Sequence, residues 1–143
     1  MFHTSRGKYA LGRGQQPLVL EVFATWCENC QAEVGALNLL YRKYRSKVDF
    51  LAVTGSKVAS NQKSPEDDAD VLSFAKVHNV MYPVAMDADR VVASKLQVVG
   101  FPAIFMIDRQ HKVVYQIYGR TPFDELDSAV KAHLETAPIT SQN

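Results

Sequence analysis

The chain has 143 residues, of which 47 % are hydrophobic and 22 % charged, and its formal net charge is +1 at pH 7. This length and this apolar content predict one domain with a sizeable core. The near-neutral charge excludes a basic surface for nucleic acid, and no stretch approaches the roughly 18 apolar residues that a membrane-spanning helix needs.

The first 16 residues contain three basic residues, three glycines and no acid, and they lack the apolar stretch of a signal peptide. We expect residues 1–16 to form a flexible N-terminal segment, with at most a short strand near residues 9–11. The domain itself is expected at residues 17–136, followed by a polar C-terminal tail at residues 137–143.

A strand that leads into a helix is predicted around the two cysteines. Residues 17–24 (PLVLEVFA) are almost all apolar, which is typical of a strand buried on both faces of a parallel sheet. Apolar residues at helical spacing then place Cys30 on the inward face of a helix. Cys27 falls at the helix N-terminus, where free backbone N–H groups and the helix dipole favour a thiolate. This geometry predicts thiol–disulfide exchange, in which an exposed Cys27 attacks and a shielded Cys30 resolves.

Two other roles for the cysteines are weaker. A structural zinc site needs four ligands, whereas the chain has two cysteines, and no two of its four histidines stand three to five residues apart. A purely structural disulfide between such close helix residues would constrain the unfolded chain very little. We therefore predict no metal and no cofactor.

The remaining elements predict an α/β fold with a central mixed sheet flanked by helices. Strands are expected at residues 48–54, 83–86, 103–107 and 113–118, and the last two form an antiparallel hairpin whose turn holds His111. After a loop at residues 56–65, a helix is expected to begin with Pro65-Glu66-Asp67-Asp68. His78 near its end is expected to be a packed residue more than a catalytic base. A short helix is predicted at residues 89–96, and the last helix begins with Thr121 as its N-cap.

A Gly-x-Pro turn feeds the strand at residues 103–107, and a cis peptide bond before Pro102 would suit a proline at a strand's first residue. With the sequences VFATWCENC and VVGFPAIFMID and with Glu33, the chain resembles the thioredoxin superfamily, and within it the TlpA/ResA-like thiol–disulfide oxidoreductases. The resemblance covers about residues 17–134. It implies a thioredoxin fold with an extra helix–strand insertion at residues 56–87. It also implies a cis-proline loop beside the cysteines, in which the backbone of Phe101 binds an extended substrate segment.

Two carboxylates accompany the cysteines. Glu21 stands six residues before Cys27, where thioredoxins keep a buried aspartate and TlpA/ResA-like proteins often keep asparagine. Burial would raise its pKa and let it shuttle the proton of Cys30, but a structural or solvent-reaching carboxylate stays an alternative. The resemblance places Glu33 beside the thiols, where it would tune them, while a solvated helix glutamate is nearly as well supported. Trp26 is interpreted as an apolar wall that helps to define a docking surface.

The chain departs from the family pattern at several positions near the site. Asn29 and Gly35 stand where prolines are common, and Ala103 replaces the usual threonine after the cis-proline. Glu28 places an acid beside Cys27 and disfavours its thiolate. A strong oxidant needs a very low thiol pKa, so these changes favour a reductant.

The sequence therefore predicts a monomeric enzyme that reduces disulfides in protein substrates and is recharged by a redox partner protein. A disulfide isomerase or oxidase is the alternative within the enzymes, and a copper-binding thioredoxin-fold chaperone is the alternative outside them. We expect a periplasmic or other extracytoplasmic location if the chain is a fragment that lacks its export signal, and a cytoplasmic one otherwise.

Overall fold

The structure, a computed structural model, describes residues 2–9, 16–56 and 67–140. Its main sheet has five strands in the order β5-β4-β3-β6-β7. Strands β3, β4 and β5 are parallel, and β6 is antiparallel to both β3 and β7. The strands are β3 (Leu18–Phe23), β4 (Asp49–Thr54), β5 (Val84–Met86), β6 (Ala103–Ile107) and β7 (Val113–Tyr118). The predicted mixed sheet is confirmed.

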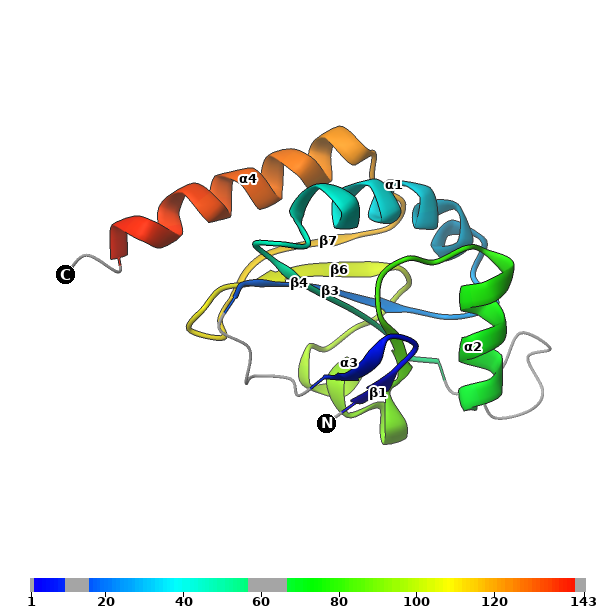
Figure 1. Cartoon of the computed structure of the whole chain (residues 1–143). Helices are drawn as coiled ribbons and strands as arrows, with labels where there is room; N and C mark the ends of the chain where they lie inside the picture. Colours follow the sequence, from blue (N-terminus) through cyan, green and yellow to red (C-terminus); the bar gives the residue numbers. More distant parts are fainter. Residues whose placement is uncertain (1, 10–15, 57–66, 141–143) are drawn as a thin grey trace.

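Helices lie on both faces of this sheet (Figure 1). Helices α1 (Glu28–Tyr44) and α4 (Phe123–Thr140) cover one face, and α2 (Asp68–Val77) adds apolar side chains to the same core. On the other face lie the 3-10 turn η1 (Ala88–Arg90), the short helix α3 (Val91–Lys95) and an N-terminal hairpin. The sheet is therefore the middle of three layers, as the resemblance to the thioredoxin superfamily implies.

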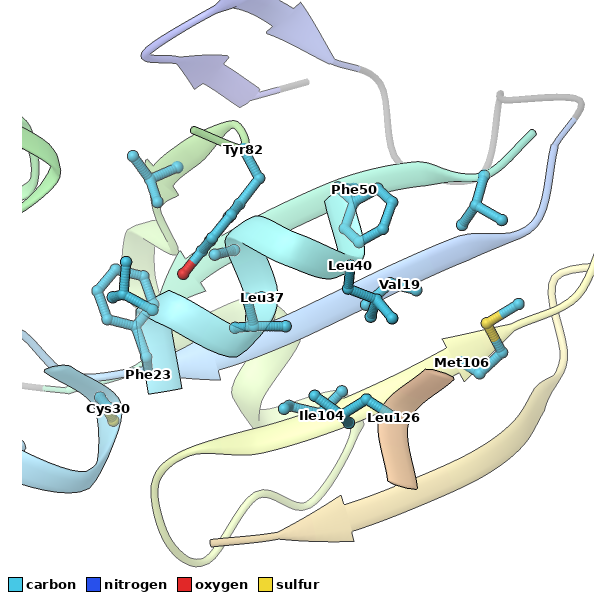
Figure 2. Close-up of a cluster of buried hydrophobic side chains, with 14 of the residues drawn as sticks. Val19, Phe23, Cys30, Leu37, Leu40, Phe50, Tyr82, Ile104, Met106 and Leu126 are labelled. Carbon is cyan, nitrogen blue, oxygen red and sulfur yellow. The ribbon is translucent and has the colours of Figure 1, made fainter. Parts of the chain in front are cut away.

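Alternate residues of β3 enter two separate cores. Val19 and Phe23 face the core beneath α1, where Figure 2 shows them with Leu37 and Leu40. The residues between them, among them Leu20, join the core beneath α3. Because side chains alternate along a strand, β3 is apolar on both faces, and this explains the unbroken apolar run in its sequence.

Residues 2–9 of the N-terminal segment form a hairpin that their sequence does not indicate, and residues 10 and 11 of the short strand expected near 9–11 lie outside the described residues. Strands β1 (Phe2–Thr4) and β2 (Gly7–Tyr9) form an antiparallel hairpin, so the expectation of a flexible tail is wrong for these residues. The backbone N–H of Ser5 donates to the carbonyl of Val84 at 3.0 Å, and Phe2 and Tyr9 pack against the second core. This edge contact supplies stabilisation that a short polar segment does not show in its own sequence.

The segment before α3 also differs from the predicted helix at residues 89–96. Asp89 and Arg90 adopt left-handed backbone conformations, with φ of 57° and 53°, so the regular helix begins only at Val91. The cause is the buried Asp87, whose carboxylate accepts the backbone N–H groups of Val92 and Ala93 at 3.0 and 2.8 Å. This capping contact fixes the start of α3 and leaves the preceding residues in a tight turn.

Three helix ends require smaller corrections. Helix α2 starts at Asp68 with Asp67 as its N-cap, and the expected first-turn residues 65 and 66, like most of the loop at residues 56–65, lie outside the described residues. The Thr121 hydroxyl donates to the Gly119 carbonyl at 3.1 Å instead of capping α4. Helix α4 continues to Thr140, into the predicted tail.

Candidate active site

The cysteine pair lies at the junction of β3 and α1. Cys27 is the N-cap of α1, and its Sγ accepts the backbone N–H of Cys30 at 3.2 Å. An N-cap side chain satisfies a backbone donor that has no partner within the helix. The sequence prediction of Cys27 at the helix N-terminus and Cys30 on its inward face is confirmed, and negative charge that develops on the Cys27 sulfur meets a backbone donor.

Both thiols are free, and both are more enclosed than expected. The exposed fraction of Cys30 is 1 %, and that of Cys27 is 7 %, so the expectation of an openly exposed Cys27 is wrong. The Cys27 thiol reaches the carbonyl of Phe101 at 3.7 Å, and the half-buried Trp26 and Phe101 pack against the same core. The Cys27 sulfur is thus covered by its own loop and by the loop that holds Phe101.

The loop before β6 forms the opposite wall of the site. Its Phe101–Pro102 peptide bond is cis, which confirms the expectation from the sequence. The contact between Cys27 and the Phe101 carbonyl joins residues 74 positions apart in the chain. The fold thus brings together the two motifs that carry the family resemblance.

Trp26 is fixed at both ends of its side chain. Its indole Nε1–H donates to the Ser56 hydroxyl at 2.8 Å, and its ring meets the Phe101 ring edge-on, with centroids 6.0 Å apart. Edge-to-face packing is a preferred arrangement for aromatic pairs. The two aromatic residues therefore form a defined rim beside Cys27, where the sequence predicts a docking surface.

Glu21 points to the α1 side of the sheet, which the sequence pattern left open. It lies on β3 between core residues, and its exposed fraction is 4 %. Its Oε2 atom has no hydrogen-bond partner. Burial raises the pKa of Glu21 to about 8, and the nearby Glu33 carboxylate raises it further. The solvent-reaching alternative is wrong, because the sheet is covered on this face.

Glu33 is buried, with an exposed fraction of 1 %, so the alternative of a solvated helix glutamate is also wrong. One of its oxygens accepts the backbone N–H of Thr121 at 2.7 Å, and the other has no partner. Burial raises the pKa of Glu33 to about 7, although the Thr121 N–H and the Arg120 charge oppose the shift. Glu33 thus ties the cysteine helix to the loop that precedes α4.

Cys30 and the two carboxyl groups form a buried titrating cluster with Tyr82. Burial raises the pKa of the Cys30 thiol far above its usual range, and the charge of Glu21 adds to this. Burial also raises the pKa of Tyr82, and the negative charges of Glu21, Glu33 and Cys30 raise it further. Figure 2 shows the Tyr82 hydroxyl directed toward the part of this core that holds Phe23. Sequence reasoning missed Tyr82, because a tyrosine before a short strand has no distinguishing pattern.

The hydrogen bond from Thr121 provides a stability prediction for Glu33. Glu33→Leu removes the acceptor and leaves the buried Thr121 N–H unpaired, so we expect it to lower the free energy of unfolding by about 1–3 kcal/mol more than Glu33→Gln does. The glutamine keeps a carbonyl oxygen at this position and is the matched control. Urea unfolding of both variants at pH 5 is the measurement, and equal losses would contradict a structural role for this bond.

The histidines considered in the sequence lie elsewhere. His78 is the C-cap of α2, and its ring packs on Phe74 with centroids 4.7 Å apart, as expected of a packed histidine. His111 lies in the turn between β6 and β7. Within the described ranges, no group of three or more His, Cys, Asp or Glu side chains is placed to hold a metal ion. No helix of that part of the chain is long and apolar enough to span a membrane.

Residues 4–116 match the family model described as "AhpC/TSA family". The thiol–disulfide oxidoreductase ResA of Bacillus thuringiensis subsp. konkukian is 30 % identical over 113 residues, which are 78 % of this chain and 60 % of that protein. The chain thus spans about 60 % of the length of the curated relative that it matches.

Solved structures share the fold. A secreted disulfide oxidoreductase of Mycobacterium tuberculosis matches with a TM-score of 0.72 and 24 % identity, over 92 % of this chain and 93 % of that one. The exposed lipoprotein thioredoxin of Streptococcus pneumoniae matches with a TM-score of 0.77 and 21 % identity, over 92 % of this chain and 96 % of that one. At these identities the likeness establishes the thioredoxin-like fold.

Proposed function

We propose that this chain, which belongs to the AhpC/TSA family, is a thiol–disulfide oxidoreductase that reduces disulfides in protein substrates. Its similarity to ResA-type relatives supports this proposal. One observation carries the proposal: the Cys27 sulfur lies between the backbone N–H of Cys30 and the carbonyl of Phe101. The nucleophilic sulfur of Cys27 therefore lies next to Cys30, the resolving thiol. It also lies next to the backbone of Phe101, with which an extended substrate segment can form hydrogen bonds.

The first step of the reaction is carried by Cys27. Its thiolate attacks one sulfur of a substrate disulfide, a bond forms between the two sulfurs, and the substrate S–S bond breaks. One substrate sulfur leaves as a thiolate. The Cys30 N–H at the Cys27 sulfur stabilises the attacking anion, and Trp26 with Phe101 forms the wall against which the substrate segment lies.

The second step needs a base, because the Cys30 thiol holds its proton tightly. We assign Glu21 as the group that accepts this proton and Glu33 as a group that tunes the cluster electrostatically. The Cys30 sulfur then attacks Cys27, and the second substrate thiolate leaves. The Cys27–Cys30 disulfide that forms is reduced again by a dithiol redox partner.

Reduction is the proposed direction in the cell. Burial raises the pKa of the Cys30 thiol, so the reduced form gains nothing from its ionisation at neutral pH. We also propose a location outside the cytoplasm, in the periplasm or on the outer face of a membrane. This location is supported by the M. tuberculosis and S. pneumoniae proteins, which are described as secreted and as an exposed lipoprotein.

The reduction potential of the Cys27–Cys30 couple tests the direction. We expect a value below that of the glutathione pool, roughly −220 to −260 mV, because burial keeps the Cys30 thiol protonated, so that its ionisation does not stabilise the reduced form. Equilibration of the protein with glutathione or dithiothreitol buffers, followed by thiol alkylation, is the measurement. A potential near −120 mV, the range of DsbA, would contradict a reductant. Failure to accelerate insulin reduction by dithiothreitol would contradict the activity itself.

A further inference from the structure

We propose that Arg90 binds an acidic side chain of the protein substrate, so that disulfides next to aspartate or glutamate are preferred. The inference deepens the proposed function and rests on it. Arg90 is the N-cap of α3 and belongs to none of the sequence motifs described above. Its hydrogen bond to Gly55 holds it at the sheet edge that also carries Cys27.

The first step is the anchor of the guanidinium group. The Arg90 Nε–H donates to the carbonyl of Gly55 at 2.7 Å. Gly55 directly follows β4, and its N–H donates to the carbonyl of Phe23 at the end of β3 at 2.8 Å. Because β3 and β4 are parallel, both strands end at the same edge of the sheet, where Cys27 follows β3. Arg90 is therefore held at the edge that carries the nucleophile.

The second step is the contact between Gly55 and the substrate rim. A Cβ atom at Gly55 would lie 3.3 Å from Cε1 of Phe101 and 2.6 Å from Cγ1 of Val22. The Gly55 backbone thus packs closely against the Phe101 ring. The next residue, Ser56, accepts the indole N–H of Trp26. Arg90, Phe101 and Trp26 consequently all lie against residues 55 and 56.

The backbone of Arg90 is constrained as well. Arg90 and Asp89 both have positive φ, which non-glycine residues adopt rarely and at a cost of order 1 kcal/mol each. The Asp87 carboxylate, bound to the backbone N–H groups at the start of α3, holds this turn in place. The Arg90 side chain is therefore preorganised, and this lowers the conformational entropy that is lost when it binds a ligand.

The third step is charge. Among the residues that the structure describes, the salt bridge joins Lys43 and Asp127, and none of their carboxylates forms an ion pair with Arg90. With Nε occupied by Gly55, the two terminal nitrogens keep four N–H donors in a plane, which suits a carboxylate. Glu28, exposed in the first turn of α1, is the acid beside Cys27 and repels a substrate acid. A substrate carboxylate is therefore expected on the Arg90 side.

The test uses short peptides in which a cysteine forms a disulfide with 2-thiopyridine, a neutral leaving group. One flanking position carries Glu, Gln or Lys, and the position is varied along the peptide. The rate of attack by Cys27 is read from thiopyridone release in stopped flow. For the best-placed position we expect the Glu peptide to react about 5-fold faster than the Gln peptide, and the difference to shrink with added salt.

Variants then assign the preference to Arg90. Arg90→Gln should abolish the difference between the Glu and Gln peptides, and Arg90→Glu should favour the Lys peptide. The matched control is Arg109→Gln, because Arg109 follows β6 at the end remote from Pro102. The rate with neutral 2,2′-dithiodipyridine should stay the same in all three variants, which separates recognition from thiol chemistry.

Two results would overturn the inference. If the unsubstituted protein reduces all peptides at equal rates at low salt, Arg90 selects no acid, although the proposed function stands. The same holds if Arg90→Gln keeps the preference. If the protein reduces none of the peptides, the proposed function itself fails. If an Arg90 variant does not fold, a preference of the unsubstituted protein for the Glu peptide that does not shrink with salt still overturns the inference.

Discussion

Cys30→Ser is expected to convert the protein into a trap for its substrates. Cys27 can still attack a disulfide, but the hydroxyl cannot release the mixed disulfide that forms, so turnover should fall by at least about 10³-fold. Cys27→Ser should also abolish insulin reduction, but without trapped substrate, because the buried Cys30 holds its proton and is enclosed in the core. The two serine variants are thus matched controls for each other.

Non-reducing electrophoresis and mass spectrometry measure this division of roles. The Cys30→Ser variant should give adducts with disulfide substrates that dithiothreitol removes, and Cys27→Ser should give none. In the unsubstituted reduced protein, Cys27 should be alkylated much faster than Cys30. Equal alkylation rates, or adducts on Cys30 in the Cys27→Ser variant, would contradict the assignment.

Glu21→Gln is expected to slow the resolution of the mixed disulfide by about 10- to 100-fold and to leave the attack by Cys27 nearly unchanged. The reason is that the Cys30 proton needs an acceptor, and an amide cannot take it. In the unsubstituted protein, resolution should speed up as pH rises through about 8, where Glu21 loses its own proton. Stopped-flow separation of the two steps between pH 6 and 9 is the measurement.

The same substitution has a signed effect on stability. The pKa of Glu21 is about 8 in the folded protein, against its ordinary value of 4.5 in the unfolded chain. Between these pH values Glu21 is ionised in the unfolded chain but keeps its proton in the folded protein. The contribution of Glu21 to the free energy of unfolding is therefore fully present below pH 4.5 and is lost as pH rises through 8. The loss is up to about 1.4 kcal/mol per pH unit in this window. Glu21→Gln has no such loss.

Urea unfolding at pH 5 and pH 8 tests this. Relative to the unsubstituted protein, the glutamine variant should gain stability between the two pH values, by up to about 4 kcal/mol. The comparison of slopes removes any pH-independent cost of the buried amide. Identical pH dependence of both proteins would mean that Glu21 does not titrate in this range. In the stopped-flow experiment, an unchanged rate of mixed-disulfide resolution in Glu21→Gln would mean that Glu21 has a structural role only.

Local patterns in the sequence were sufficient for the elements that carry the cysteines. The apolar run before Cys27 and the helical spacing after Cys30 predicted β3 and α1 closely, and the bounds of β6 and β7 match the structure. These signals are local because a strand or a helix exposes its buried face through the spacing of nearby residues. The N-terminal hairpin was missed because its stabilising partner, β5, lies some 80 residues away in the chain.

The sequence by itself determined which atoms do the proposed chemistry, because a thiol pair at a helix N-terminus is a local arrangement. Only the tertiary structure decided the surroundings of that pair. It placed the charge of Glu21 near enough to Cys30 to raise that thiol's pKa, buried Glu33 against Thr121, 88 residues away, and bound Arg90 to Gly55. Such contacts depend on which faces of the sheet the helices cover and on where loops meet at its edge. Burial and charge at the site follow from this packing, and no spacing within one segment records it.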